Sequence, residues 1–285
     1  MNHRSSEYLQ AFKKSRKLFI GTVLVFVLLV VALCAPLLAP YDPYKIDVRN
    51  RLSKVSADHL LGTDHLGRDT LSQIIYGTRT SILISLVGTL IAFVIGISLG
   101  TTAAYVGGTT ENLILLYFDV IRSFPAIILI LVIVSTLGPS ITTIILVFGF
   151  IYSSLLGRTA RAVALSVIKE PFVESAVILG SRTKTILMKH ILPNIIGPLL
   201  IVTGMYVPIM IMSEAGLSFL GLGVPPPTAS WGSTLRYGFE NILRAWWLIL
   251  WPSLALALAM LSFNLFAEGL RDILNPEKRG ELIIS

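Results

Sequence analysis

The sequence is poor in charged residues and in cysteine. Only 14% of its 285 residues are charged, whereas 54% are hydrophobic, and several uncharged runs are too long for a soluble domain of this size. The single cysteine, Cys34, excludes an intrachain disulfide and a cysteine metal cluster. The low charge and the long uncharged runs predict an integral membrane protein.

Catalytic and nucleotide-binding motifs are also missing. The chain has no G-x-x-x-x-G-K-[ST] loop to hold phosphates, and neither H-E-x-x-H nor G-x-S-x-G, which would indicate hydrolysis. We therefore predict no catalytic residue and no enzyme activity in the chain itself. The net charge of +7 needs no nucleic acid as partner, because basic residues flanking membrane helices account for it.

Long apolar runs are what the sequence has in abundance. A helix needs about 20 residues to cross ~30 Å of hydrocarbon. The longest run breaks at Gly138-Pro139, because proline lacks a backbone donor and disfavours helix in the residue before it. The sequence predicts an all-α polytopic membrane protein with six transmembrane helices. Their expected bounds are 18–38, 81–106, 113–135, 140–157, 191–213 and 246–267.

The basic residues indicate the orientation, since lysine and arginine favour the cytoplasmic side. With both termini inside, the cytoplasmic pieces hold fourteen of the 23 basic residues and the external pieces hold eight. The predicted organisation is a cytoplasmic tail (1–17), a first membrane helix (18–38), an external loop (39–80), a helical core (81–268) with a cytoplasmic loop at 158–190, and a cytoplasmic tail (269–285). The lipid bilayer is thus the first predicted partner.

Small residues recur at every fourth position of the second predicted helix. They are Gly88, Ala92, Gly96, Gly100, Ala104 and Gly108, and they share one helix face. Another helix can approach that face closely. Static packing within the chain is favoured over a sliding subunit interface.

Three ionisable residues fall in or at the predicted helices. Asp119 and Arg122 are three positions apart, so they are expected to share a face and to pair near the cytoplasmic boundary. Glu214 ends the fifth predicted helix and is expected to be an interfacial carboxylate. A proton relay or a contact with a solute is the alternative for each, because charges inside a membrane are costly and often functional.

The external segment DHLLGTDHLGRD, residues 58–69, gathers His59, His65 and three aspartates. Imidazole and carboxylate can bind a transition metal. A capped turn is favoured instead, because the two glycines suit tight turns and Thr63 or Asp64 can serve as an N-cap. No metal site is therefore predicted.

The most informative segment is polar and lies deep between hydrophobic spans: EPFVESAVILGSRTKTILMKHILPN, residues 170–194. Pro171 suits the first turn of a short helix, and Gly180 can end that helix. Ser181 can cap a second short helix, SRTKTILMKHIL, after which Pro193 leads the chain into the fifth membrane helix. Helices this short cannot span a bilayer. The small residues beside Glu174 favour insertion into a groove of a protein over lying on the membrane.

Glu174-Ser175-Ala176, followed by Gly180 and Leu192-Pro193, resembles the EAA loop of ABC-importer permeases, which forms their coupling helix. Serine replaces the first alanine of that pattern, and His190 stands where isoleucine is common. Four further stretches resemble one subfamily, the C-type permease subunit of dipeptide, oligopeptide and nickel ABC importers. They are LGTDHLGRDTLSQIIYG (61–77), FDVIRSFP (118–125), EAGLSFLGLGVPPPTASWG (214–232) and FNLFAEGLRDILNP (263–276).

The resemblance implies a type I importer core in helices two to six, with the first helix peripheral. It implies a second permease subunit, two ATPase subunits that use ATP and Mg²⁺, and an external solute-binding protein, in the cytoplasmic membrane of a bacterium or archaeon. No cofactor is expected in this chain. ATPase coupling is expected at Glu174, Ser175, Ala176, Gly180, Leu192 and Pro193, with Phe172 as an apolar anchor.

Peptides are the first choice of solute, and His59 and His65 keep nickel or a metal chelate open as the alternative. Two other classes also stay open. A secondary transporter would need inverted repeats or several buried ionisable residues near the midplane, whereas a membrane scaffold or receptor component needs only the helices and the docking loop. ATP dependence of uptake separates the importer from both.

Overall fold

Residues 15–274 are described by the computed structural model, and their regular structure is helical apart from one isolated bridge between Thr63 and Asp69. The all-α class is confirmed. The elements are α2 (Arg16–Leu33), α3 (Ala35–Leu38), a 3₁₀ turn (Val48–Asn50), α4 (Thr70–Val106), α5 (Gly108–Arg122), α6 (Ala126–Leu137), α7 (Ile141–Ile168), α8 (Pro171–Ile178), α9 (Thr183–Thr185), a π turn (Ile186–Ile191), α10 (Leu192–Phe219), α11 (Trp231–Glu240) and α12 (Trp247–Leu274).

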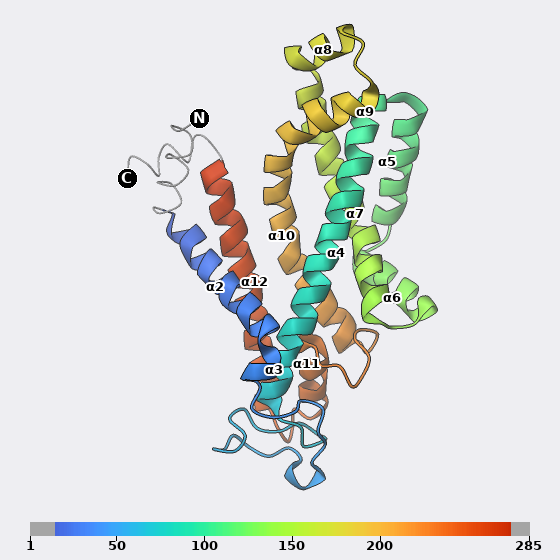
Figure 1. Ribbon diagram of the computed structural model, residues 1–285. Helices are drawn as coiled ribbons and strands as arrows, with labels where there is room; N and C mark the ends of the chain where they lie inside the picture. Colours follow the sequence, from blue (N-terminus) through green and yellow to red (C-terminus); the bar gives the residue numbers. More distant parts are fainter. Residues whose placement is uncertain (1–14, 275–285) are drawn as a thin grey trace.

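The helices form an elongated bundle with two distinct ends (Figure 1). One end carries α8, the start of α2 and the end of α12. The opposite end carries α3, α11 and the loop that precedes α4. The segment predicted to dock a partner therefore projects from the same end as the first and last described helices.

Helix α2 is peripheral and packs on α12 (Figure 1). Glycine makes this contact close: a Cβ on Gly21 would meet the backbone of Phe266, and one on Gly269 would meet the backbone of Leu18. The predicted helix 18–38 is interrupted at Cys34, because a proline occupies the first turn of the separate helix α3.

The core is built on α4 and α7, and the stripe of small residues lies between them. A Cβ on Gly96 would come within 2.7 Å of the Ser153 carbonyl oxygen, and one on Gly100 would overlap the carbonyl oxygen of Gly157. The stripe therefore packs inside this chain. Its last predicted member, Gly108, lies outside α4 and opens α5.

Helices α4 and α7 are both longer than predicted. Helix α4 begins at Thr70 and α7 ends at Ile168, each eleven residues beyond the expected bounds of 81 and 157. The start of α4 is fixed by Asp69, whose side chain accepts a hydrogen bond from the backbone N–H of Ser72 at 2.8 Å. The capped turn expected before it is present, because the Asp64 side chain accepts hydrogen bonds from the backbone N–H groups of Leu66 at 2.8 Å and Arg68 at 3.0 Å.

The third predicted helix, 113–135, is wrong as a continuous helix. Helix α5 ends at Arg122 and α6 begins at Ala126, with a bend of 89° between them. Pro125 precedes α6 and has no N–H with which to continue α5. Within residues 15–274, five helices are long and apolar enough to cross a membrane, or six if this bent pair counts as one span.

The prediction that the second short helix is distinct from the fifth membrane helix is also wrong. Helix α9, the π turn Ile186–Ile191 and α10 form one continuous helical run. The π turn changes the hydrogen-bond register just before the proline, so the missing N–H is accommodated without ending the helix. Helix α10 then runs to Phe219, past the expected end at residue 213.

Candidate coupling site

Helix α8 is a short helix held on the end of the bundle by two buried side chains. Pro171 stands in its first turn, as predicted. Val173 is 2% exposed and Ala176 is 5% exposed, and both join an apolar cluster that includes Ala160 of α7 and Ile191 of the π turn. Burial of this one face orients α8 relative to the membrane helices.

The opposite face of α8 is open. Phe172, Glu174 and Ser175 are exposed, and the Ser175 hydroxyl donates to the Pro171 carbonyl at 2.8 Å. The apolar surface continues beyond the helix end, where Leu179 is 83% exposed. A large exposed apolar side chain beside a carboxylate, on an element that projects from the bundle, is typical of a docking surface.

Gly180 ends α8 in a left-handed turn with φ +74°. Its N–H donates to the Val177 carbonyl at 2.9 Å, and the Ser181 N–H donates to the Ala176 carbonyl at 3.1 Å. This pair of bonds is a Schellman motif, in which glycine adopts the positive φ without steric cost. No heavy atom lies within 4 Å of a Cβ built at Gly180, so the requirement for glycine comes from the backbone alone.

The second half of the segment differs from the prediction in one detail. Arg182, not Ser181, is the N-cap of α9, and no side chain caps that helix. Leu192 is half-buried at the start of α10, whereas Pro193 is exposed. Ala176 and Leu192 therefore belong to one apolar cluster beneath α8. Phe172, Glu174 and Ser175 lie on the exposed surface of the helix.

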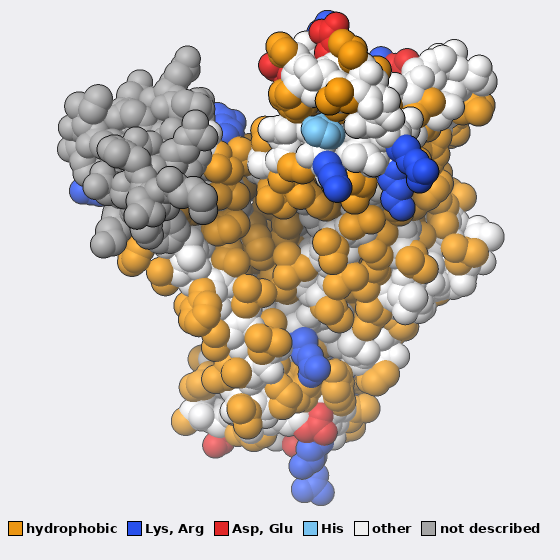
Figure 2. Space-filling model, turned by 45° about the horizontal axis from the view of Figure 1, so that its top comes forward, with side chains coloured by type: hydrophobic (Ala, Val, Ile, Leu, Met, Phe, Trp, Pro, Cys, Tyr) orange, Lys and Arg blue, Asp and Glu red, His pale blue; other side chains and the backbone are white. Residues whose placement is uncertain are grey.

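Basic side chains gather near the α8 end on the face seen in Figure 2, above a broad apolar band. The segment that follows Gly180 supplies Arg182, Lys184 and Lys189. A cationic fringe next to an apolar band is the pattern expected at a cytoplasmic membrane boundary.

The predicted pairing of Asp119 with Arg122 is wrong. Asp119 pairs with Arg158 of α7 instead. A second ion pair joins Glu111 of α5 to Arg161 of α7, and Arg122 is exposed. The two residues of α5 share a helix face by spacing, yet α7 packs beside α5 and brings two arginines closer. Only the tertiary arrangement could reveal this.

The prediction that Glu214 is an interfacial carboxylate is wrong, because the residue is fully buried. It lies within α10 and accepts hydrogen bonds of 2.7 Å from the hydroxyls of Ser81 and Ser218. The prediction failed because α10 continues past residue 214 and because α4 and α11 cover that turn. The serine four positions after Glu214 was the one signal in the sequence for a buried partner.

The two histidines of the segment before α4 have structural partners. His59 Nδ1 lies 2.9 Å from Asp69 Oδ1, and the His65 ring packs on Tyr237 at 4.6 Å between centroids. Burial lowers the pKa of His65, and the nearby Asp64 opposes that shift. Among residues 15–274, no three His, Cys, Asp or Glu side chains are grouped so as to hold a metal ion.

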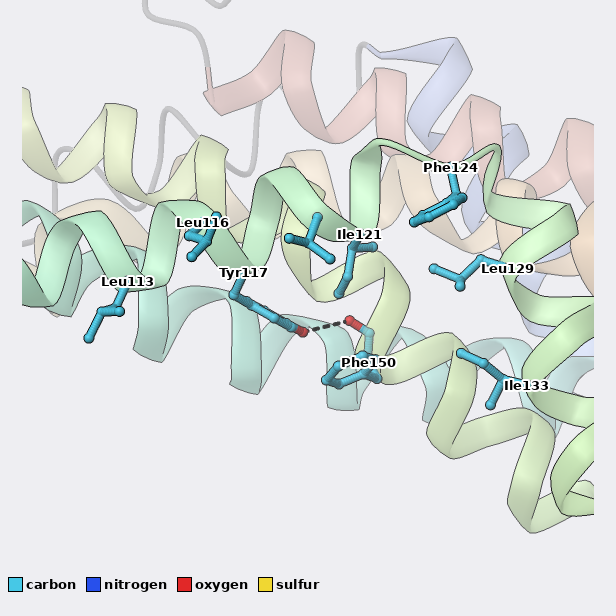
Figure 3. Close-up of a pocket in the computed structure, with 9 residues that line it drawn as sticks. Leu113, Leu116, Tyr117, Ile121, Phe124, Leu129, Ile133 and Phe150 are labelled. Atoms are coloured by element: carbon cyan, nitrogen blue, oxygen red, sulfur yellow. Dashed lines mark hydrogen bonds between the residues drawn. The ribbon is translucent and has the colours of Figure 1, made fainter.

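An apolar pocket of about 440 Å³ lies at the bend between α5 and α6, and no motif in the sequence predicted it. Figure 3 shows its lining side chains, which come from α5, α6 and Phe150 of α7. The one hydroxyl among them, on Tyr117, bonds to the Phe150 carbonyl at 2.9 Å and to Ser153. The pocket therefore offers no free polar group to a charged solute.

The fold resembles two solved ABC transporters. One is an amino acid ABC transporter crystallised with histidines, at a TM-score of 0.54 and 16% identity, covering 70% of this chain and 91% of that one. The other is the inward-facing MetNI methionine ABC transporter, at a TM-score of 0.55 and 16% identity, covering 72% of this chain and 98% of that one. The chain therefore shares its fold with the membrane-spanning chains of these two transporters.

Sequence comparison gives the family. Residues 92–280 match the binding-protein-dependent transport system inner membrane component, and residues 5–55 match the N-terminal TM domain of oligopeptide transport permease C. The chain belongs to this family of inner membrane components.

Relatives in the family carry names from peptide transport. The chain is 35% identical over 268 residues to a putative peptide transport system permease protein of Brucella suis, covering 94% of this chain and 90% of the relative. It is 33% identical to the dipeptide transport system permease protein DppC of Alkalihalophilus pseudofirmus, with coverage of 96% and 90%. It is also 33% identical to the oligopeptide transport system permease protein OppC of Haemophilus influenzae, with coverage of 90% and 83%.

Proposed function

We propose that this chain forms one half of a peptide-import pathway, together with a second permease subunit, two ATPase subunits and an external solute-binding protein. Dipeptides or oligopeptides are the solute class, because the relatives that cover most of the chain are named for them. Nickel has no comparable support.

The observation that carries the proposal is the outer face of α8. Val173 and Ala176 pack this helix against α7 and the π turn, so a force applied to α8 is transmitted to the membrane helices. Phe172, Glu174 and Ser175 remain free to enter a groove of an ATPase subunit. The chain has no phosphate-binding loop, so ATP and Mg²⁺ belong to those partners.

The mechanism follows as alternating access. ATP draws the two ATPase subunits together, and their grooves carry the α8 helices of both permeases with them. The permease pair opens outward to receive solute, and hydrolysis restores the inward state. On this proposal the α8 end faces the cytoplasm, together with both termini.

The test is ATP-dependent uptake by the reconstituted complex. The chain is purified in mild detergent with its co-purifying subunits, placed in liposomes with the binding protein, and supplied with a labelled dipeptide. The double variant F172A/E174A should lose both ATPase co-purification and uptake. L243A is the control, because Leu243 is 99% exposed on the loop between α11 and α12, at the opposite end. Uptake that is independent of ATP, or unchanged in the double variant, contradicts the proposal.

A further inference from the structure

A groove of about 400 Å³ lies between the peripheral helix α2 and the core helix α4. Leu29 and Leu33 line it from α2, and Leu83 and Leu86 line it from α4. Its one charged lining residue is Arg79. The groove lies toward the end of the bundle that carries α3, because Leu33 is the last residue of α2.

Arg79 has no counter-ion in the described part of the chain. It is exposed, and no ion pair or side-chain hydrogen bond joins it to any of residues 15–274. By contrast, Arg68 pairs with Asp64, and Arg236 pairs with Glu240. A guanidinium left without a carboxylate is available to an external anion.

The position of Arg79 is that of a residue at the membrane boundary. The uncharged stretch of α4 begins directly after it. Arg79 also lies near Tyr44 of the external segment, since its charge lowers the pKa of that phenol, which burial raises. The guanidinium is therefore placed between the water-exposed loop and the apolar surface of α4, where arginine side chains reach toward headgroups.

An apolar strip leads from Arg79 along the same face of α4. Leu83, Leu90 and Val94 follow at positions i+4, i+11 and i+15, and they are 48%, 59% and 55% exposed. A hydrocarbon chain beginning at Arg79 would meet the groove first and this strip next. Along α4, the cationic side chain of Arg79 therefore comes first, the groove follows, and the apolar strip comes last.

We propose that the groove between α2 and α4 binds a phospholipid of the outer leaflet, with its phosphate on Arg79 and one acyl chain between the two helices. The planar guanidinium donates two parallel hydrogen bonds to phosphate oxygens, and a lipid without a phosphate cannot accept them in this geometry. A protein helix in the groove would instead have to supply a carboxylate opposite Arg79 at the edge of the bilayer. The lipid site is independent of the transported solute.

The test uses the full chain, with its co-purifying subunits, in nanodiscs that contain a phosphatidylglycerol bearing a photoreactive acyl chain. Illumination should label peptides from α4 and α2 around the groove. R79Q should reduce that labelling about tenfold, the equivalent of one lost charge-assisted contact. R244Q is the matched control, because Arg244 is also exposed and lies at the same end, on the loop between α11 and α12. It should leave the labelling unchanged.

A second arm keeps the test independent of any variant's folding. Photoreactive diacylglycerol, which has the same chains and no phosphate, should label the groove of the unaltered chain far less than phosphatidylglycerol does. Equal labelling by the two lipids overturns the proposal. It is also overturned if R79Q labels as strongly as R244Q, or if a photoreactive residue at position 83 cross-links to a co-purifying subunit in place of lipid.

Discussion

Ser81 and Glu214 lie 133 positions apart in the sequence and are joined by a hydrogen bond of 2.7 Å inside the bundle. The Ser81 hydroxyl also accepts from the backbone N–H of Trp231, the first residue of α11, at 3.3 Å. On the other carboxylate oxygen, Ser218 donates to Glu214 and accepts from the Val224 N–H at 3.2 Å. One buried carboxylate therefore ties α4, α10 and the segment before α11 together.

Removing this carboxylate should destabilise the protein. E214L leaves the hydroxyls of Ser81 and Ser218 without an acceptor, at a cost of about 1–3 kcal/mol for each buried group. E214Q keeps one acceptor oxygen and should cost less. The readout is the midpoint of thermal unfolding in detergent.

The control for Glu214 is Met212, two positions earlier in α10 and 57% exposed. M212L should leave the unfolding midpoint unchanged. If E214L unfolds at the same temperature as M212L, the hydrogen-bonded carboxylate does not contribute to stability.

A methyl group at Gly100 should separate α4 from α7. The Cβ of G100A would overlap the carbonyl oxygen of Gly157, and that backbone can move only by opening the helix pair. We expect the free energy of unfolding to fall by about 1–3 kcal/mol, as for other overpacked cores. The readout of this destabilisation is a lower yield of monodisperse protein in size-exclusion chromatography than for the unaltered chain.

Gly197 is the matched control for Gly100. It is also a helical glycine, but no atom lies within 4 Å of a Cβ built there. G197A should be neutral or stabilise the helix by up to about 1 kcal/mol. Equal yields of G100A and G197A would argue against tight packing along the stripe.

A β-branched residue at Gly180 should uncouple transport. G180V cannot hold φ +74° without strain of about 1–2 kcal/mol, so the Schellman turn that sets the exit from α8 changes. ATP-driven peptide uptake in proteoliposomes should fall at least several-fold while membrane insertion persists.

Gly138 offers the comparison for Gly180. It has φ +86° and similarly open surroundings, but it lies between α6 and α7, away from α8. G138V carries the same backbone strain and should retain most of the uptake. Equal losses in the two variants would assign the effect to strain in general rather than to coupling.

Reversing one charge of the Asp119–Arg158 pair should be repaired by reversing the other. R158D places two carboxylates side by side, and D119R/R158D restores opposite charges. Both side chains are partly exposed, so the restored pair is worth at most about 1 kcal/mol. Thermal unfolding of the single and double variants in detergent measures the recovery.

Arg122 tests the partner assignment directly. R122D should leave the unfolding midpoint near that of the unaltered chain, because Arg122 lies outside the pair. A loss equal to that of R158D, rescued by D119R, would restore the pairing of Asp119 with Arg122.

Local features of this protein could be predicted from the sequence because their causes are local. Long uncharged runs require helices, since only a helix satisfies its own backbone in hydrocarbon. Pro171 and Gly180 bound α8, because the first fixes φ for a first turn and the second permits a left-handed turn. The spacing of the small residues likewise indicated one tightly packed face of α4.

Only the tertiary structure decided which residues pair across helices and where each helix continues or breaks. Asp119 pairs with Arg158 because α7 packs beside α5, and Glu214 is buried because α4 and α11 cover its turn. The sequence also did not show that the helix bends by 89° near Pro125 yet continues through Pro193 after a π turn. Such contacts join residues far apart in sequence, and no local pattern encodes which helix stands opposite which.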